Sequence, residues 1–266
     1  MIRKYIPLLL AVCLIALGWV LYVYVFPNPR SVYTAHTPSS KATITVSGDS
    51  AHYTSGPRDR ARAVLSDGTE MVLNPNTEII VPKTFTDTVR EIRVNGDAYF
   101  VVANKDFPFM LTTRNLRLLI GGESTASFRV TAFDKDEGES VEVLKGAVNA
   151  TKNYVSKDNE AELLAGGDMV MINRSIDLME KETYDVSTLQ AWCDDRLVFN
   201  NASFDTVVRQ LQDWFGITIN VNGTPDDLAP LSVSFRHANL EEVLGTLSKA
   251  YHCKFRIEKY AAELDF

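Results

Sequence analysis

The stretch from Val94 to Ala103 reads VNGDAYFVVA, and it decides the fold of the larger part of the chain. Apolar residues alternate with other residues at positions 92, 94, 98, 100 and 102, and this period of two is typical of a β-strand with one buried face. Asn95-Gly96 interrupts the pattern with a turn signal, because glycine accepts the positive φ that a tight hairpin needs. We therefore predict a hairpin whose strands are residues 89–94 and 98–103.

Two further pairs of short β-like runs surround turn signals of the same kind. Residues 63–65 and 69–73 flank Ser66-Asp67-Gly68, and residues 141–144 and 147–150 flank Lys145-Gly146. No long helical period occurs between about residues 42 and 173. Strands at this spacing predict an all-β sandwich or jelly-roll-like domain over residues 43–180.

The N-terminal segment from Tyr5 to Phe26 is apolar and carries no charge. A helix of about 20 such residues crosses a bilayer, and Pro27 ends it. A cleaved signal peptide has a shorter core and a small-residue cleavage site, and a lipoprotein signal needs a small residue where Val12 stands. We therefore expect an uncleaved transmembrane helix over residues 5–26. Arg3 and Lys4 keep a stub of residues 1–4 in the cytoplasm, with a spacer over residues 27–42 on the far side.

Composition restricts the classes of function that remain. The chain has 27 Lys and Arg against 34 Asp and Glu, a net charge of -7, which disfavours nucleic-acid binding. Three cysteines are too few for a disulfide scaffold or a Cys-rich zinc site. No catalytic or nucleotide-binding motif is present. We therefore predict no enzyme activity, no cofactor and no metal site.

The C-terminal part is an internal repeat with an offset of 36 residues. Its paired positions are Phe199 and Phe235, Ala202 and Ala238, Phe204 and Leu240, Val207 and Val243, Val208 and Leu244, Leu211 and Leu247, Phe215 and Tyr251, and Ile219 and Phe255. Each copy reads strand, helix, strand, with one apolar helical face. Ser203 and Asn239 are suited to cap the two helices. We expect a small α+β domain over residues 189–266, with one sheet and two helices on one of its faces.

The motifs of the β-rich part resemble the FecR family of anti-sigma regulators, which are anchored in the bacterial inner membrane. The resemblance rests on Leu65-Ser66-Asp67-Gly68-Thr69, Arg90, the 94–103 stretch, Phe107-Pro108-Phe109, Leu144-Lys145-Gly146-Ala147-Val148 and Leu164-Ala165-Gly166-Gly167. It covers roughly residues 43–173. The segment 121–130 departs from the family pattern by a short insertion, which leaves the register of that strand open.

The repeat resembles the C-terminal domain that follows the FecR region in many members, related to the signalling modules of secretins and TonB-dependent transducers. Trp192, Leu197 and Phe199 fit its W-x-x-x-x-L-x-F pattern. Family members normally carry a helical sigma-binding domain before the span. The short stub here leaves direct sigma binding unsupported.

Several reactive side chains have simpler explanations than a site. None of His36, His52, His237 and His252 has metal-like spacing to another ligand, so we expect spacer and exposed-loop positions. Cys193 and Cys253 would share an oxidising compartment, which leaves a disulfide open, but Cys253 matches the inward position of Ile217. The acidic run 134–139 lacks the spacing of an EF-hand, and we interpret it as a solvated loop.

The resemblance implies a signal relay. The periplasmic domains would bind the signalling domain of an outer-membrane TonB-dependent transducer and regulate a sigma factor, directly or through another protein. Strand addition suits a small sheet with open edges. We predict the edge at Leu231–Arg236, with its Val233, Phe235 and Arg236, and apolar anchors at Trp214 and Phe215. The alternatives are an adaptor of envelope assemblies and, less favoured, an enzyme acting on surface glycans.

Overall fold

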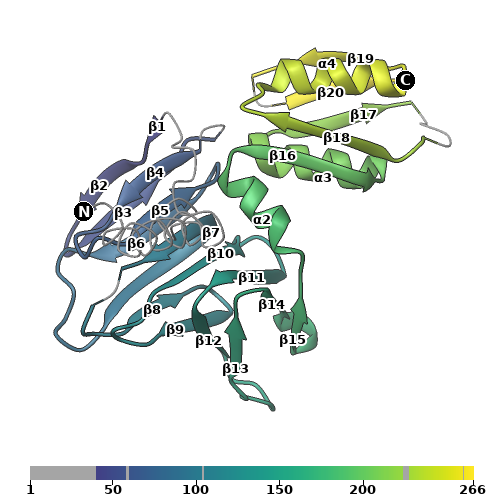
Figure 1. Ribbon diagram of the computed structural model, residues 1–266. Coiled ribbons are helices and arrows are strands. Elements are labelled where there is room, and N and C mark those ends of the chain that lie inside the picture. Colours follow the sequence, from purple (N-terminus) through teal and green to yellow (C-terminus); the bar gives the residue numbers. More distant parts are fainter. Residues whose placement is uncertain (1–39, 58–59, 104, 224–227, 260) are drawn as a thin grey trace, which may run out of the picture. The chain divides into compact units, whose positions relative to one another are not determined.

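A computed structural model describes residues 40–266 apart from 58–59, 104, 224–227 and 260 (Figure 1). Residues 37–266 form one compact unit. The predicted membrane helix at residues 5–26 and the predicted stub lie outside the described residues, as does most of the spacer. In the described part of the chain, no helix is both long and apolar enough to cross a membrane.

The β domain runs from the first strand to residue 183 and contains, in its described residues, one short 3-10 turn at Arg174–Ile176 besides strands. Its strands are β1 (Ser40–Lys41), β2 (Thr43–Ser47), β3 (Ser50–Thr54), β4 (Ala61–Val64), β5 (Glu70–Leu73), β6 (Glu78–Pro82), β7 (Arg90–Val102), β8 (Phe109–Thr112), β9 (Leu116–Ile120), β10 (Ala126–Ala132), β11 (Gly138–Lys145), β12 (Ala147–Lys152), β13 (Glu162–Ala165), β14 (Asp168–Asn173) and β15 (Leu178–Thr183). The prediction of an all-β domain is confirmed.

The strands form two sheets that share β7. The first has the order β1-β4-β5-β7-β10-β11-β14-β15, and the second β2-β3-β6-β7-β8-β9-β12-β13. Neighbours are antiparallel except for β1 with β4 and β7 with β8. The buried side chains of both sheets make a common core, in which the rings of Phe100 and Phe128 stack 5.5 Å apart.

The predicted hairpin at Asn95-Gly96 is wrong. One continuous strand, β7, passes through both residues. Asn95 pairs with Glu78 in the second sheet, and Gly96 pairs with Ala132 in the first. Gly96 has a φ of +134°, and a Cβ there would lie 2.6 Å from the Cα of Thr77. Gly96 therefore allows β7 to pass from one sheet to the other while Thr77 packs close to its backbone. The alternation of apolar residues in the sequence is the same for such a crossing strand as for a hairpin, so it could not tell the two apart.

Of the other two predicted hairpins, one is confirmed and one is wrong. β4 and β5 pair in antiparallel fashion around Ser66-Asp67-Gly68, and the Gly68 amide donates to Leu65 O at 2.9 Å. Strands β11 and β12, by contrast, join different sheets on either side of Gly146. Lys145-Gly146 is therefore a corner of the sandwich.

The open register of the 121–130 segment is settled by the pairing of β10. The inserted residues form the turn between β9 and β10, and the Glu123 amide donates to Lys105 O at 2.7 Å. Phe128 lies opposite Phe100 on β7, and the pairing with β11 shifts between Ser127 and Phe128. The extra length is thus absorbed by a turn and a bulge.

The C-terminal domain follows a connecting helix, α2 (Val186–Cys193), and keeps the predicted repeat. Its elements are β16 (Arg196–Ala202), α3 (Phe204–Phe215), β17 (Thr218–Asn222), β18 (Leu231–Arg236), α4 (Leu240–Tyr251), β19 (Lys254–Ile257) and β20 (Ala261–Asp265). The two helices begin and end 36 residues apart, as the repeat predicts. Buried residues at equivalent positions, such as Val207 and Val243, make one core.

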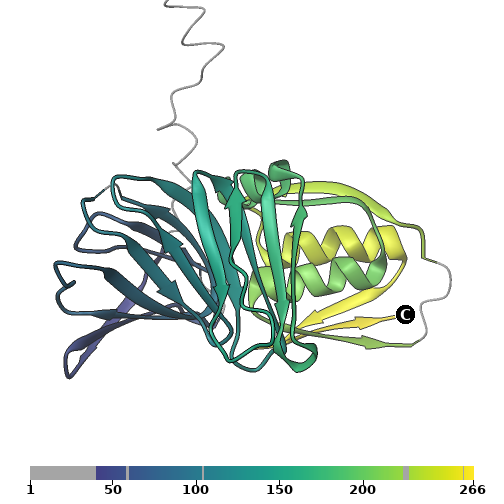
Figure 2. The same ribbon diagram turned by 90° about the horizontal axis from the view of Figure 1, so that it is seen from below.

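The prediction of one sheet with helices on one face is wrong. β16 pairs with β18, whereas β17 and β19 both pair with β20 in a separate sheet. Figure 2 shows the two helices lying between these sheets. The apolar stripe of α3 is wide enough for this, because Val208 and Phe215 also pack on the core beside Val207. The final strand, whose Ala262 and Leu264 are fully buried, was not predicted.

The helix ends confirm the capping prediction. The Ser203 side chain accepts from the Thr206 amide, and Asn239 forms a capping box with Glu242. Gly216 and His252 end the two helices with φ values of 61° and 56°. Gly216 also packs closely against the β domain. A Cβ built at this position would lie only 2.1 Å from Pro57 O.

Replacing Gly96 by alanine is expected to lower the free energy of unfolding by about 2–4 kcal/mol, because the side chain adds backbone strain and overlaps Thr77. Gly245 in α4 is a matched control, since a Cβ there has open space. Gly245→Ala should instead stabilise by about 0.5–1 kcal/mol. Urea unfolding of the full chain measures both changes. Equal effects of the two substitutions would contradict the role given to Gly96.

Candidate functional site

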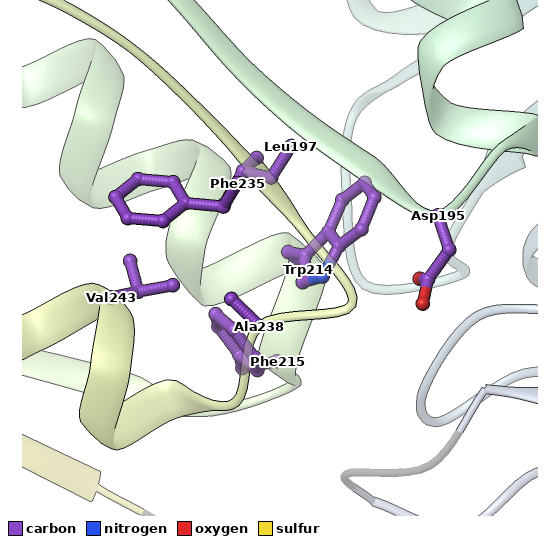
Figure 3. A pocket seen from close by; sticks show the side chains of 7 residues that line it. All are labelled: Asp195, Leu197, Trp214, Phe215, Phe235, Ala238 and Val243. Atoms are coloured by element: carbon purple, nitrogen blue, oxygen red, sulfur yellow. The ribbon is translucent and has the colours of Figure 1, made fainter.

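The predicted apolar anchors gather at a pocket of the C-terminal domain. Trp214 and Phe215 at the end of α3 and Phe235 of β18 line a small pocket of about 10 Å³, with room for roughly one water molecule (Figure 3). The remaining lining residues are Asp195, Leu197, Ala238 and Val243. Phe235 packs edge-on against Phe199, with ring centroids 6.3 Å apart. The anchors are half-buried, so they fill the domain's own core as well as facing the pocket.

The remaining predicted residues lie on opposite faces of β18. Val233 shares the inner face with Phe235 and packs on the core. The side chain of Arg236 lies on the exposed face of β18, together with those of Ser232 and Ser234. The structure therefore brings Trp214, Phe215 and Phe235 together at one pocket, places Val233 beside it in the core, and leaves Arg236 on the outer face.

Strand β18 has one paired and one open side. It pairs with β16, and no other described strand pairs with it. The His237 amide donates to Asp195 O at 3.2 Å, directly beyond the opposed residues Arg196 and Arg236. Hydrogen-bonded and non-bonded pairs alternate in an antiparallel ladder. The backbone N–H and C=O of Ser234 therefore point to the open side.

Next to this pocket, the ring of Trp192 in α2 contacts two arginines of the β domain. The guanidinium carbon of Arg60 is 4.0 Å from the ring centroid, and that of Arg129 is 4.8 Å away. Arg60 also donates to Trp192 O at 3.3 Å and pairs with Asp195 at 2.9 Å. We call Arg60, Arg129, Trp192 and Asp195 the tryptophan clamp. Cation–π contacts of this kind strengthen when they are shielded from water.

The clamp is charged yet largely buried. Arg129 binds Asp97 through two hydrogen bonds, from Nε at 2.8 Å and from Nη2 at 2.6 Å. Burial by itself lowers the pKa of Arg129, but the adjacent Asp97 carboxylate outweighs it, so the net pKa is raised. Burial lowers the pKa of Arg60, and Asp195 opposes that shift. Both guanidiniums therefore hold their charge through a specific carboxylate.

The sequence indicated only one member of the clamp. Trp192 belongs to a family-like pattern, but nothing in the spacing marks Arg60 or Arg129 as its neighbours. Arg129 lies in the strand whose register was open. The signal that existed was Asp97, a carboxylate directly before the apolar run 98–103, whose side chain needs a charged partner once it is buried.

The cysteines that the structure describes are buried and unbonded. Cys193 and Cys253 are free thiols, so the disulfide left open by the sequence does not form. Burial raises the pKa of the Cys193 thiol to about 12. Cys253 occupies the inward position equivalent to Ile217, as predicted, and both side chains are buried.

No group of three potential metal ligands gathers within the described ranges. His52 is in strand β3, not in a loop as predicted, and its Nδ1 lies 2.8 Å from Glu78. His237 lies 3.0 Å from Asp195. In the acidic run, Glu139 turns inward and accepts from the Asn115 amide at 3.0 Å, so its carboxylate is structural.

Two family models match the chain. The FecR protein model covers residues 51–149, and the model for the FecR C-terminal region covers residues 196–261. Together they span the β domain's central strands and nearly all of the C-terminal domain. No match to a curated protein was found.

Among solved structures, two crystal structures of a Parabacteroides distasonis protein, provisionally described as an anti-sigma factor, share the fold. Both have a TM-score of 0.63 and 23% identity. The alignments cover 80% and 81% of this chain and 97% and 98% of the other. The likeness therefore extends over both domains.

Replacing Arg129 by methionine is expected to cost about 3–5 kcal/mol of unfolding free energy, because it strands the buried Asp97 carboxylate. Arg256→Met is the matched control: that arginine pairs with Glu263 but is 66% exposed, so its loss should cost at most about 1 kcal/mol. Adding Asp97→Asn to Arg129→Met should recover part of the loss. Tryptophan fluorescence during urea unfolding measures all three, and similar losses for the two arginines would contradict the clamp's energetic role.

Proposed function

Because the chain belongs to the FecR family, we propose that it is a single-span inner-membrane signal-relay protein of the anti-sigma type. Both matching family models are of FecR type, and we propose a regulatory role without catalysis. In this proposal the predicted helix at residues 5–26 anchors the chain, and both described domains lie in the periplasm. They receive a signal from a TonB-dependent transducer and regulate a sigma factor, directly or through another protein.

The observation that carries the proposal is the open side of β18 beside the aromatic pocket. The Ser234 backbone supplies a donor and an acceptor at that side, and strand addition uses such groups for affinity. The half-buried aromatic side chains of Trp214 and Phe235 offer apolar surface near the edge, which would add specificity through contacts with side chains of the partner. The outward Arg236 adds a positive charge for an acidic segment of the partner.

A pull-down with tagged full-length chain from membranes of its own host tests the proposal. Recovery of an outer-membrane TonB-dependent transducer is the expected result. Recovery of other envelope proteins without a transducer would favour the adaptor function instead. A sigma factor recovered together with the chain would add support for the regulatory output.

Two proline variants test the strand edge. Ser234→Pro removes an outward N–H while leaving the ladder to β16 intact, so transducer recovery should fall at least tenfold. Val198 lies opposite Ser234 on β16, and its own backbone groups face the other open side. Val198→Pro is therefore the matched control and should leave recovery unchanged. A loss with Val198→Pro alone would place the interaction on β16.

A further inference from the structure

Strand β2 is an edge of the second sheet that nothing in the described structure protects. It pairs with β3 only, and all five of its residues are exposed. Ile44 is 56% exposed and Val46 is 59% exposed. The purple hairpin of β2 and β3 lies at the rim of the β domain in Figure 2. A strand that gains so little burial from its own domain is an unusual place for four β-branched residues in a row.

The other edges of the β domain are shielded, as natural sheets require to avoid unwanted pairing. β1 has only two residues, and β15 carries Glu180, Lys181 and Glu182. At β13, the Lys181 ammonium donates to Leu163 O at 2.7 Å. β2, with the sequence TITVS, has none of these devices. An uncharged, β-branched edge is suited to pairing with another strand.

The sequence of β2 is complementary to itself when reversed. In an antiparallel pair with a two-fold axis at Thr45, Ile44 of one copy lies opposite Val46 of the other. Thr43 lies opposite Ser47 in the same register. Apolar residues therefore meet apolar residues on one face, and hydroxyls meet hydroxyls on the other, pairings that stabilise antiparallel strands.

An antiparallel pair of two identical strands is two-fold symmetric, so it occupies both β2 edges and closes as a dimer. The complementarity is confined to β2 itself, because Lys41 belongs to β1 of the first sheet and Asp49 lies in the turn before β3.

We propose that β2 is a dimerisation strand, which pairs antiparallel with β2 of a second copy about a two-fold axis at Thr45. The pairing extends the second sheets of two chains into one continuous sheet. It lies in the β domain, so it is separate from the strand-addition edge proposed at β18. A dimer would present two β18 edges at once.

Cysteine cross-linking of the full chain in membranes tests the register. Opposed residues in an antiparallel pair have Cα atoms about 4.5–5.5 Å apart, within disulfide range, so Thr45→Cys should give cross-linked dimer. Thr43→Cys is the matched control, because its two copies would be about 14 Å apart. We expect at least fivefold more dimer from Thr45→Cys, with the parent chain giving the background of the native cysteines.

A mixed experiment and an edge-blocking variant make the outcome decisive. Co-expressed Thr43→Cys and Ser47→Cys chains should cross-link to each other, which checks the register if Thr45→Cys folds poorly. Ile44→Lys should reduce cross-linking at least fivefold, whereas Leu163→Lys, at another exposed edge position, should not. Equal dimer from Thr45→Cys and Thr43→Cys, with no product from the mixed pair, would overturn the proposal.

Discussion

The buried carboxylate of Asp97 is the interaction on which the two-domain structure depends. Asp97 directly follows Gly96, where β7 passes from one sheet to the other. Its carboxylate accepts hydrogen bonds from Arg129 and from Asn74 Nδ2, the latter at 2.5 Å. The Asp97 amide donates to the Thr77 hydroxyl at 2.9 Å, and that hydroxyl donates to the Asp97 carbonyl oxygen at 3.0 Å. One residue thus fixes the crossing strand, the β5–β6 turn and β10. Through Arg129 it also positions Trp192 and the start of the C-terminal domain.

In our two proposals, the open strands β18 and β2 serve different kinds of interface. β18 lies beside an aromatic pocket and a charged residue, a combination that favours a partner of distinct sequence. β2 is exposed along its whole length, and its own reversed sequence complements it. The clamp connects the two domains, because Arg129 donates to the buried Asp97 and Arg60 pairs with Asp195.

Sequence reasoning succeeded where the pattern is local. The helix boundaries of the repeat, the Ser203 and Asn239 caps and the inward Cys253 follow from residues within a few turns of each other.

Sequence reasoning failed where the chain passes from one sheet to another. Asn95-Gly96 and Lys145-Gly146 look like hairpin turns, yet each changes sheet, because a corner and a reversal use the same glycine chemistry. The last strand and the second C-terminal sheet were missed for a similar reason: strand pairing joins residues far apart in the chain. The anchors Trp214 and Phe215 were predicted from their apolar character and remain a prediction, whereas the clamp around Trp192 depends on contacts that no spacing in the sequence records.

The two helix ends of the repeat differ in which residues they accept. His252 takes nearly the same left-handed backbone as Gly216 with a side chain in place, so the backbone conformation alone does not demand glycine. At Gly216 a Cβ would lie 2.1 Å from Pro57 O. The contact with the β domain therefore restricts position 216 to glycine, whereas position 252 accommodates a side chain.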